Sequence, residues 1–313
     1  MSFQVSRTGQ NNTALIHLSD NNHSTAVSVI PAVGAMLHEF IVQVNDQPFN
    51  IIDNYQLNRP VREQVTDYFK SIKLSPWVCR MNEGRYNFNG VTYQSKKMHS
   101  DGTALHGLLY DQPFTVEDES ATANSASVVI KHDYKGYDPG YPFHYTCRVR
   151  YTLHAGARLE VETTLINQSN VEIPVADGWH PYFKLGGKVN DWELFYPAKA
   201  KLEFNDKLIP TGKMLPFSQF NKPSLIGNTE MDNCFQLAEQ ACTLRNPANG
   251  LKISLLPDAA YPYLQVFIPG HRESIAIENL SSAPDSFNNH LGLVILPPGE
   301  SRSFRVFYVA GVE

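Results

Sequence analysis

The sequence predicts an all-β protein, built as a large antiparallel β-sandwich. Short runs rich in β-branched and aromatic residues recur along the chain, and turn-forming residues separate them every ~10 to 12 residues. In a chain of 313 residues this spacing gives on the order of 25 strands, more than one open sheet holds without splitting into packed layers. Because the sequence has no repeat of fixed period and no Pro/Ser-rich linker, we expect a single domain over residues 1–313.

Composition limits the classes of partner. The net charge is −5, from 26 basic and 31 acidic residues without long runs of either sign, so we expect no nucleic acid and no membrane partner but a small neutral molecule. The start of the sequence lacks a basic segment followed by an apolar one, and we expect a cytoplasmic protein. The sequence contains no C-x-x-C pair, so its four cysteines are expected to be reduced thiols: Cys79, Cys147, Cys234 and Cys242.

The residues from Ala14 to Ile52 predict an opening β-meander, and a separate hairpin is predicted further on. Asn45-Asp46 and Asn89-Gly90 each separate two alternating runs and predict hairpin turns. Residues 32–40 carry small side chains at alternate sites, which predicts a strand closely packed by a neighbour. Residues 61–73 predict a helical turn that ends before Pro76.

The rest of the chain alternates cleanly between apolar and polar residues over several runs. These runs predict antiparallel strands at residues 128–130, 147–153, 159–167, 251–256, 263–270, 293–300 and 304–310. Between the first two lies a segment from Tyr134 to Tyr145 that contains four Tyr. This segment is interpreted either as an aromatic cover over a pocket or as a packed surface loop.

Glu278 stands where a buried strand, residues 275–278, runs into a loop. Side chains alternate between the faces of a strand, so Glu278 shares its face with Ser274 and Ala276. These small neighbours leave room beside the carboxylate for a ligand. The alternative interpretation is a solvent-exposed glutamate at a strand end, because Glu is mostly an exposed residue.

Two histidines occur in similar surroundings. His106 is expected on a strand face shared with Ala104, and His180 follows the small residues Ala176 and Gly178 at a strand end closed by Pro181. A single His among apolar residues is more often a satisfied core residue. The second occurrence beside small residues favours a shared site.

Arg80, just before the Asn89-Gly90 hairpin, and Asp232, just before a later strand, complete the candidate set. A guanidinium suits paired hydroxyls or a carboxylate, although such an Arg is usually a surface cation. A metal triad is not favoured, since H-x-H and H-E-x-x-H are absent, and no G-x-S-x-G predicts a serine nucleophile. A carboxylate and an imidazole facing each other across a polyol are suited to opening and closing a sugar ring by acid–base catalysis.

Five segments, in this order, resemble the aldose 1-epimerase (galactose mutarotase) family along almost the whole chain. They are RMNEGRYNFNGVTYQ at residues 80–94, LHGL at 105–108, HPYFKLG at 180–186, MDNCF at 231–235 and IENLSSAPDSFN at 277–288. The resemblance implies a β-supersandwich, no metal or organic cofactor, and interconversion of the α and β anomers of a free aldose.

By position in these segments, the resemblance gives each candidate a role. It implies that His180 is the general acid and Glu278 the general base, while Arg80, His106 and Asp232 bind the sugar. The unperturbed imidazole pKa of ~6.5 lets His180 exchange a proton near neutral pH.

The sequence departs from the family pattern beside two of these positions. Cys79 stands where the family often has Asn, and Asn279 where it often has Pro or Thr. These departures concern the substrate. They leave as alternatives a different hexose, a sugar phosphate, or a sugar-binding or sugar-sensing protein without turnover.

Overall fold

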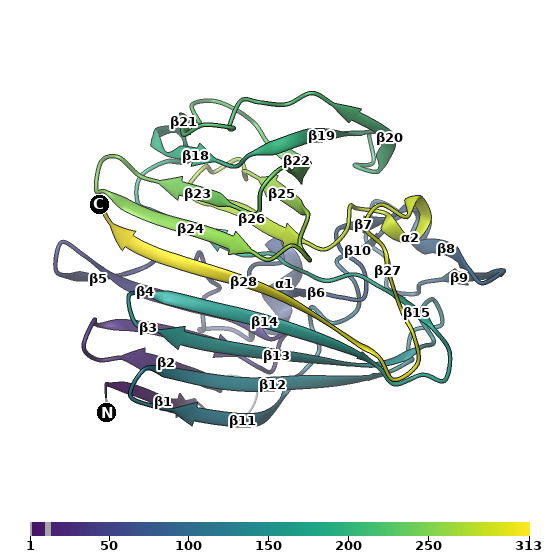
Figure 1. Ribbon diagram of the computed structural model, residues 1–313, viewed down its shortest axis with the longest axis horizontal. Helices are drawn as coiled ribbons and strands as arrows, with labels where there is room; N and C mark the ends of the chain where they lie inside the picture. The colour runs from purple at the N-terminus through teal and green to yellow at the C-terminus, as the bar shows by residue number, and fades with distance from the viewer. Residues whose placement is uncertain (1, 10–13) are drawn as a thin grey trace.

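The computed structural model describes residues 2–9 and 14–313, and within them the fold is a stack of antiparallel sheets. Figure 1 shows the longest strands crossing the molecule side by side in one large sheet. In spatial order this nine-stranded sheet contains β11 (Thr115–Ala121), β12 (Ser125–Lys135), β13 (His144–His154), β14 (Arg158–Asn167), β28 (Ser301–Val312), β24 (Leu251–Pro257), β23 (Cys242–Arg245), β18 (Glu193–Phe195) and β21 (Ser224–Leu225).

Two further sheets of the described residues pack against this one. The eight-stranded sheet contains β20 (Pro210–Leu215), β19 (Ala198–Phe204), β22 (Asp232–Leu237), β25 (Tyr263–Phe267), β26 (Ile275–Leu280), β16 (Gly178–Trp179) and β6 (Lys73–Leu74), with β17 (Tyr182–Phe183) also paired to β26. The five-stranded sheet contains β1 (Phe3–Thr8), β2 (Leu15–Asp20), β3 (Thr25–Ile30), β4 (Met36–Val44) and β5 (Gln47–Asn50), and its strand β2 contacts β12 and β13.

Short elements gather at one end of the long strands. Figure 1 shows β7 (Arg80–Met81), β10 (Ala104–Leu105), β8 (Arg85–Phe88), β9 (Val91–Gln94) and helix α2 (Ser286–Asn289) grouped there. The remaining elements are β15 (Ile173–Val175), β27 (Val294–Leu296), helix α1 (Val61–Tyr68) and the 3₁₀ turns Asn82–Gly84 and Val189–Asp191. Neither α-helix in the described part of the chain has the length and apolar character that crossing a membrane requires.

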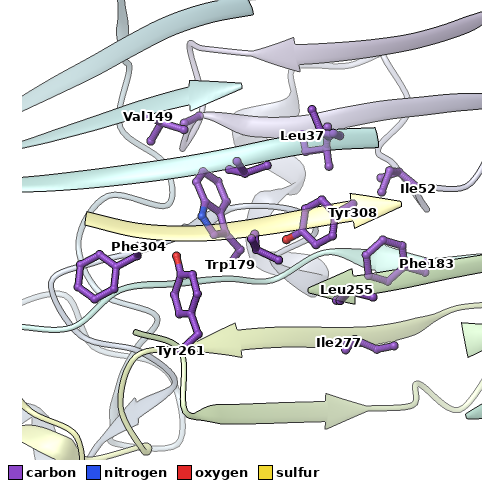
Figure 2. Packing of buried hydrophobic residues seen from close by; sticks show 14 of the residues in the cluster. Leu37, Ile52, Val149, Trp179, Phe183, Leu255, Tyr261, Ile277, Phe304 and Tyr308 are labelled. Atoms are coloured by element: carbon purple, nitrogen blue, oxygen red, sulfur yellow. The ribbon is translucent and has the colours of Figure 1, made fainter. Parts of the chain in front are cut away.

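One apolar core joins the two largest sheets. Leu255 of β24 and Tyr308 of β28 belong to the same buried cluster as Ile277 of β26. Figure 2 shows these side chains in the space between the strands, together with Trp179 and Phe183. Burying one such side chain stabilises the fold by about 1.5 to 3 kcal/mol, so this shared core fixes β26 firmly against β24 and β28.

Most local predictions are confirmed. The Asn45-Asp46 turn joins β4 to β5 with both residues at positive φ (50° and 59°), and Asn89-Gly90 joins β8 to β9 with φ of 50° and 78°. Such backbone angles are those of two-residue hairpin turns. The predicted helical turn is α1, which ends at Tyr68, earlier than expected. All four cysteines are free and buried.

The strand predicted over residues 32–40 is wrong at its start, and for the segment from Tyr134 to Tyr145 the pocket-cover alternative is excluded. Residues 32–35 form a turn and not a strand, because Gly34 (φ 58°) lies directly on the backbone of Tyr110 and a Cβ there would approach the Tyr110 carbonyl oxygen to 2.3 Å. Close packing was correctly predicted, but the strand begins only at Met36. The segment from Tyr134 to Tyr145 does not line the cavity described below. Tyr134, Tyr141 and Tyr145 are fully buried in the core, since their rings pack on one another.

Candidate active site

A cavity of ≈ 270 Å³ opens between the eight-stranded sheet and the short elements at its edge. All the residues that the sequence predicted for the site contribute to its lining: Arg80, His106, His180, Asp232 and Glu278. The cavity is also lined by Cys79, Gln265 and several aromatic side chains, among them Phe69, Tyr182, Phe204 and Phe267.

Glu278 lies on the floor of the cavity. It is the fourth residue of β26, which continues to Leu280, so it stands within the strand and not at its end as predicted. Its side chain is only 2% exposed, so the alternative interpretation of Glu278 as a solvent-exposed residue is excluded. In the pairing of β26 with β25, Gln265 lies directly opposite Glu278, and Figure 2 shows the neighbouring Ile277 turned into the core.

His180 faces the Glu278 carboxylate. Its Nε2 lies 3.2 Å from Oε1 of Glu278, and its ring stacks on Tyr182 with centroids 5.1 Å apart. The backbone holds it from both sides, because the His180 N–H donates to Ile72 and its carbonyl accepts from Ser71. The ring is therefore fixed in orientation beside the carboxylate.

Burial governs the electrostatics of this pair. The His180 pKa falls to about 4 because burial disfavours the imidazolium, which differs from the near-neutral value expected from the residue type. Burial raises the Glu278 pKa well above its ordinary value, and the nearby Asp232 charge adds to the rise while Arg80 and Cys79 oppose it. Both neutral forms are favoured, so the pair carries one titratable proton at intermediate pH.

His106 forms one wall. It follows β10 in a left-handed conformation (φ 60°), contrary to the predicted strand, and its N–H donates to the Cys79 carbonyl. The turn is needed because Gly107 lies against the backbone of Ser75, where a Cβ would approach the Ser75 carbonyl oxygen to 2.2 Å. Edge-on contacts with Phe69 (4.8 Å) and His180 (4.9 Å) fix the ring. Burial, then the His180 and Arg80 charges, hold the His106 pKa well below its usual value.

Arg80 and Asp232 line the cavity from two different strands, β7 and β22. The Arg80 Nε donates to the Asp101 carboxylate at 3.0 Å, which orients the guanidinium from β7. Asp232 begins β22 and accepts a 2.7 Å hydrogen bond from the Gln265 amide. Burial raises the Asp232 pKa, an effect that the Arg80 charge opposes.

Gln265 is a pocket residue to which the sequence analysis gave no role, and Cys79 is one that it named only as a departure from the family pattern. The Oε1 of Gln265 is buried and has no hydrogen-bond partner among the described residues, and the same holds for Nδ1 of His106 and Nδ1 of His180. The Cys79 thiol lies 3.9 Å from Oε2 of Glu278 and donates to it. Alternation on the strand from Tyr263 would have placed Gln265 on one face, but only the register with β26 puts it beside Glu278.

Comparison with known protein families gives one match that spans most of the chain. The model of the aldose 1-epimerase family matches residues 15–308. Protein YihR of Escherichia coli, which is described as uncharacterised, is 29% identical over 245 residues, covering 75% of this chain and 76% of that protein. A maltose epimerase of Levilactobacillus brevis is 24% identical over 266 residues, covering 81% of this chain and 73% of that enzyme.

Solved structures show the same fold. A galactose mutarotase-like protein from Clostridium acetobutylicum superimposes with a TM-score of 0.88 at 16% identity, covering 100% of this chain and 99% of its own. A galactose 1-epimerase from Lactobacillus acidophilus gives 0.81 at 19% identity, covering 99% and 98%. The fold is thus that of the galactose mutarotase-like proteins, and the match over residues 15–308 shows that the chain belongs to the aldose 1-epimerase family.

Proposed function

We propose that this protein is an aldose 1-epimerase that interconverts the α and β anomers of a free hexose by acid–base ring opening and closure. The observation that carries the proposal is the Glu278–His180 pair, 3.2 Å apart at the floor of an open cavity. Membership of the aldose 1-epimerase family supports the reaction class. We further propose that residues 1–313 act as one domain.

In the proposed mechanism, the sugar enters between the two groups and replaces their direct contact. In the state that reacts, the one proton of the pair lies on His180: the Glu278 carboxylate takes the proton of the C1 hydroxyl, the His180 imidazolium gives its proton to the ring oxygen, and the C1–ring oxygen bond breaks. Rotation about C1–C2 presents the other face of the aldehyde, and the reverse transfers close the ring with the inverted configuration. The pair ends with the same number of protons, so the step is balanced.

The lining favours a neutral polyol over a sugar phosphate. His106 and Gln265 line the cavity, and each has a buried polar atom without a hydrogen-bond partner among the described residues. Among the described residues, Arg80 is the only Lys or Arg in the lining, and Asp101 already pairs with it. A phosphate group would call for further cations.

The direct test is polarimetry on freshly dissolved α-anomers of several aldoses, with and without protein. At least one free hexose is expected to equilibrate faster in proportion to protein concentration. Sugar binding measured by calorimetry without any acceleration would instead identify a binding protein, and acceleration confined to a 6-phosphate would identify a sugar-phosphate epimerase.

Arg80→Ala and His106→Ala are expected chiefly to raise KM. Loss of a hydrogen bond to the charged guanidinium costs ~1.5 to 3 kcal/mol, or roughly 10- to 150-fold, whereas the neutral His106 contributes ~0.5 to 1.5 kcal/mol, roughly 2- to 12-fold. Calorimetric titration with the preferred sugar measures both. Arg85→Ala, a change at an exposed arginine of β8, is the matched control. Unchanged affinity in both test variants would remove Arg80 and His106 from the sugar site.

The dependence of kcat/KM on pH is expected to be bell-shaped, because the active pair holds one proton. As pH falls, a second proton enters and no base remains; as pH rises, the shared proton leaves and no acid remains. His180→Asn should lose most of the rate. It should also lose the alkaline limb of the profile, because the remaining activity requires only that Glu278 be deprotonated. His154→Asn, at a partly exposed histidine that pairs with Glu160, should keep the wild-type profile. An intact bell in His180→Asn would identify another acid.

A further inference from the structure

Three different metal-ligating groups meet at the floor of the cavity. The sulfur of Cys79, an imidazole nitrogen of His106 and a carboxylate oxygen of Glu278 all lie within 4.8 Å of one another. Each side chain is more than nine-tenths buried, and all three line the open cavity. The three residues therefore border one cavity that is open to solvent.

This donor set matches a thiophilic divalent cation. Zn²⁺ binds thiolate at ≈ 2.3 Å, imidazole at ≈ 2.0–2.1 Å and carboxylate at ≈ 2.0–2.2 Å, so ligand atoms around a tetrahedral ion lie roughly 3.3 to 3.6 Å apart. Rotamer adjustments of about 1 Å inward from the present spacing suffice. Mg²⁺ and Ca²⁺, which prefer oxygen ligands, do not fit a thiol and an imidazole.

Three features of the surroundings support a cation here. The Nδ1 of His106 has no hydrogen-bond partner among the described residues although it is buried. Asp232 brings a second carboxylate into the cavity, and the one lining guanidinium, Arg80, is paired with Asp101. Three protein ligands leave a fourth position open toward the cavity, as in exchangeable zinc sites.

We propose that Cys79, His106 and Glu278 bind one thiophilic divalent cation of the Zn²⁺ class, and that the bound cation blocks the sugar site. On binding, the Cys79 thiol and the Glu278 carboxyl lose their protons to solvent, and the Cys79 sulfur and a Glu278 oxygen each donate an electron pair to the metal. The cation occupies the Glu278 carboxylate and the His106 nitrogen. The inhibitory part rests on the proposed function, whereas the binding part does not.

Cobalt(II) tests the binding part directly, because thiolate coordination gives a charge-transfer band in the near ultraviolet. The wild-type protein is expected to show this band at one equivalent of Co²⁺, and Zn²⁺ should displace it. Cys79→Ala and Cys79→Ser should lose the band and weaken Zn²⁺ binding by more than the ~10- to 100-fold that loss of a supporting residue costs. Cys242→Ala, at a cysteine buried in β23, is the matched control and should keep the band.

Two results would overturn the binding part: no band in the wild-type protein, or a band that survives both Cys79 substitutions in folded protein. Circular dichroism of each variant establishes folding, and the two substitutions differ in polarity so that one failure to fold leaves the other usable. If both misfold, His106→Gln takes their place, with the same expected loss of Zn²⁺ affinity and with retained affinity as the contrary result.

The inhibitory part is measured by polarimetry, comparing the rate of each protein with and without Zn²⁺. Wild-type turnover should fall with Zn²⁺, recover with a chelator and show competition with sugar, whereas Cys79→Ser should keep its own rate unchanged on adding Zn²⁺. Zn²⁺ bound to the site without loss of wild-type turnover would disprove inhibition. Absence of turnover with every aldose would disprove the proposed function and leave the cobalt result standing.

Discussion

Glu278→Gln is expected to lower kcat by ~10²- to 10⁴-fold while the fold is kept, because the amide has the shape of the carboxylate and cannot accept the C1 proton. Sugar affinity should stay within about tenfold, since the amide still offers one acceptor and one donor in the same place. The buried pair with His180 loses a shared proton but creates no isolated charge. Polarimetry in the presence of a chelator gives the rate, and calorimetry the affinity.

Glu273→Gln is the matched control for this change. Glu273 precedes the same strand, but its side chain is 67% exposed and its partner is the surface residue Lys188. It should retain the wild-type rate. If Glu278→Gln kept most of its kcat while Glu273→Gln behaved as expected, Glu278 would not be the base.

Lys73→Met is expected to lower the free energy of unfolding by ~3 to 5 kcal/mol, because it leaves a buried carboxylate without its cation. The Lys73 Nζ lies 2.6 Å from Oδ2 of Asp177 and donates to the Gly178 carbonyl at 2.8 Å, and both side chains are fully buried. Urea denaturation followed by fluorescence measures the loss.

The double variant Lys73→Met/Asp177→Asn is the control. With both charges removed, most of the lost stability should return, and the difference between single and double variants isolates the unpaired charge. Burial raises the Asp177 pKa, so its protonation relieves the charge and the deficit of Lys73→Met should be smaller at about pH 5 than at about pH 8. Equal denaturation midpoints for wild type and Lys73→Met would show that the ion pair contributes nothing.

The strands and hairpins were predictable because their causes are local. The alternation at residues 147–153 and the Asn89-Gly90 pair determine β13 and the β8–β9 turn from adjacent residues alone. The turns at Gly34 and His106 were not predictable, since each depends on contact with backbone distant in the sequence, at Tyr110 and Ser75.

The candidate site was predictable as a set of residues but not as an electrostatic unit. Small neighbours in the sequence identified Glu278 and His180, and both line the cavity. The low pKa of His180 comes from burial by other segments, which no residue type reveals. The position of Gln265 beside Glu278 depends on the register between β25 and β26. The proximity of Cys79 to His106 depends on the pairing of β7 with β10.

The residues that line the cavity come from two kinds of element, long sheet strands and short marginal strands. Glu278, Gln265 and Asp232 project from strands of the eight-stranded sheet, whereas Arg80 and His106 are carried by or follow two-residue strands at its margin, next to the end of α1. Insertions and substitutions are tolerated more readily in short connecting segments than in a packed sheet. Under the proposed function, descendants of this protein can therefore acquire new sugar preferences by remodelling the margin while Glu278 keeps its place, which separates the evolution of selectivity from the evolution of rate.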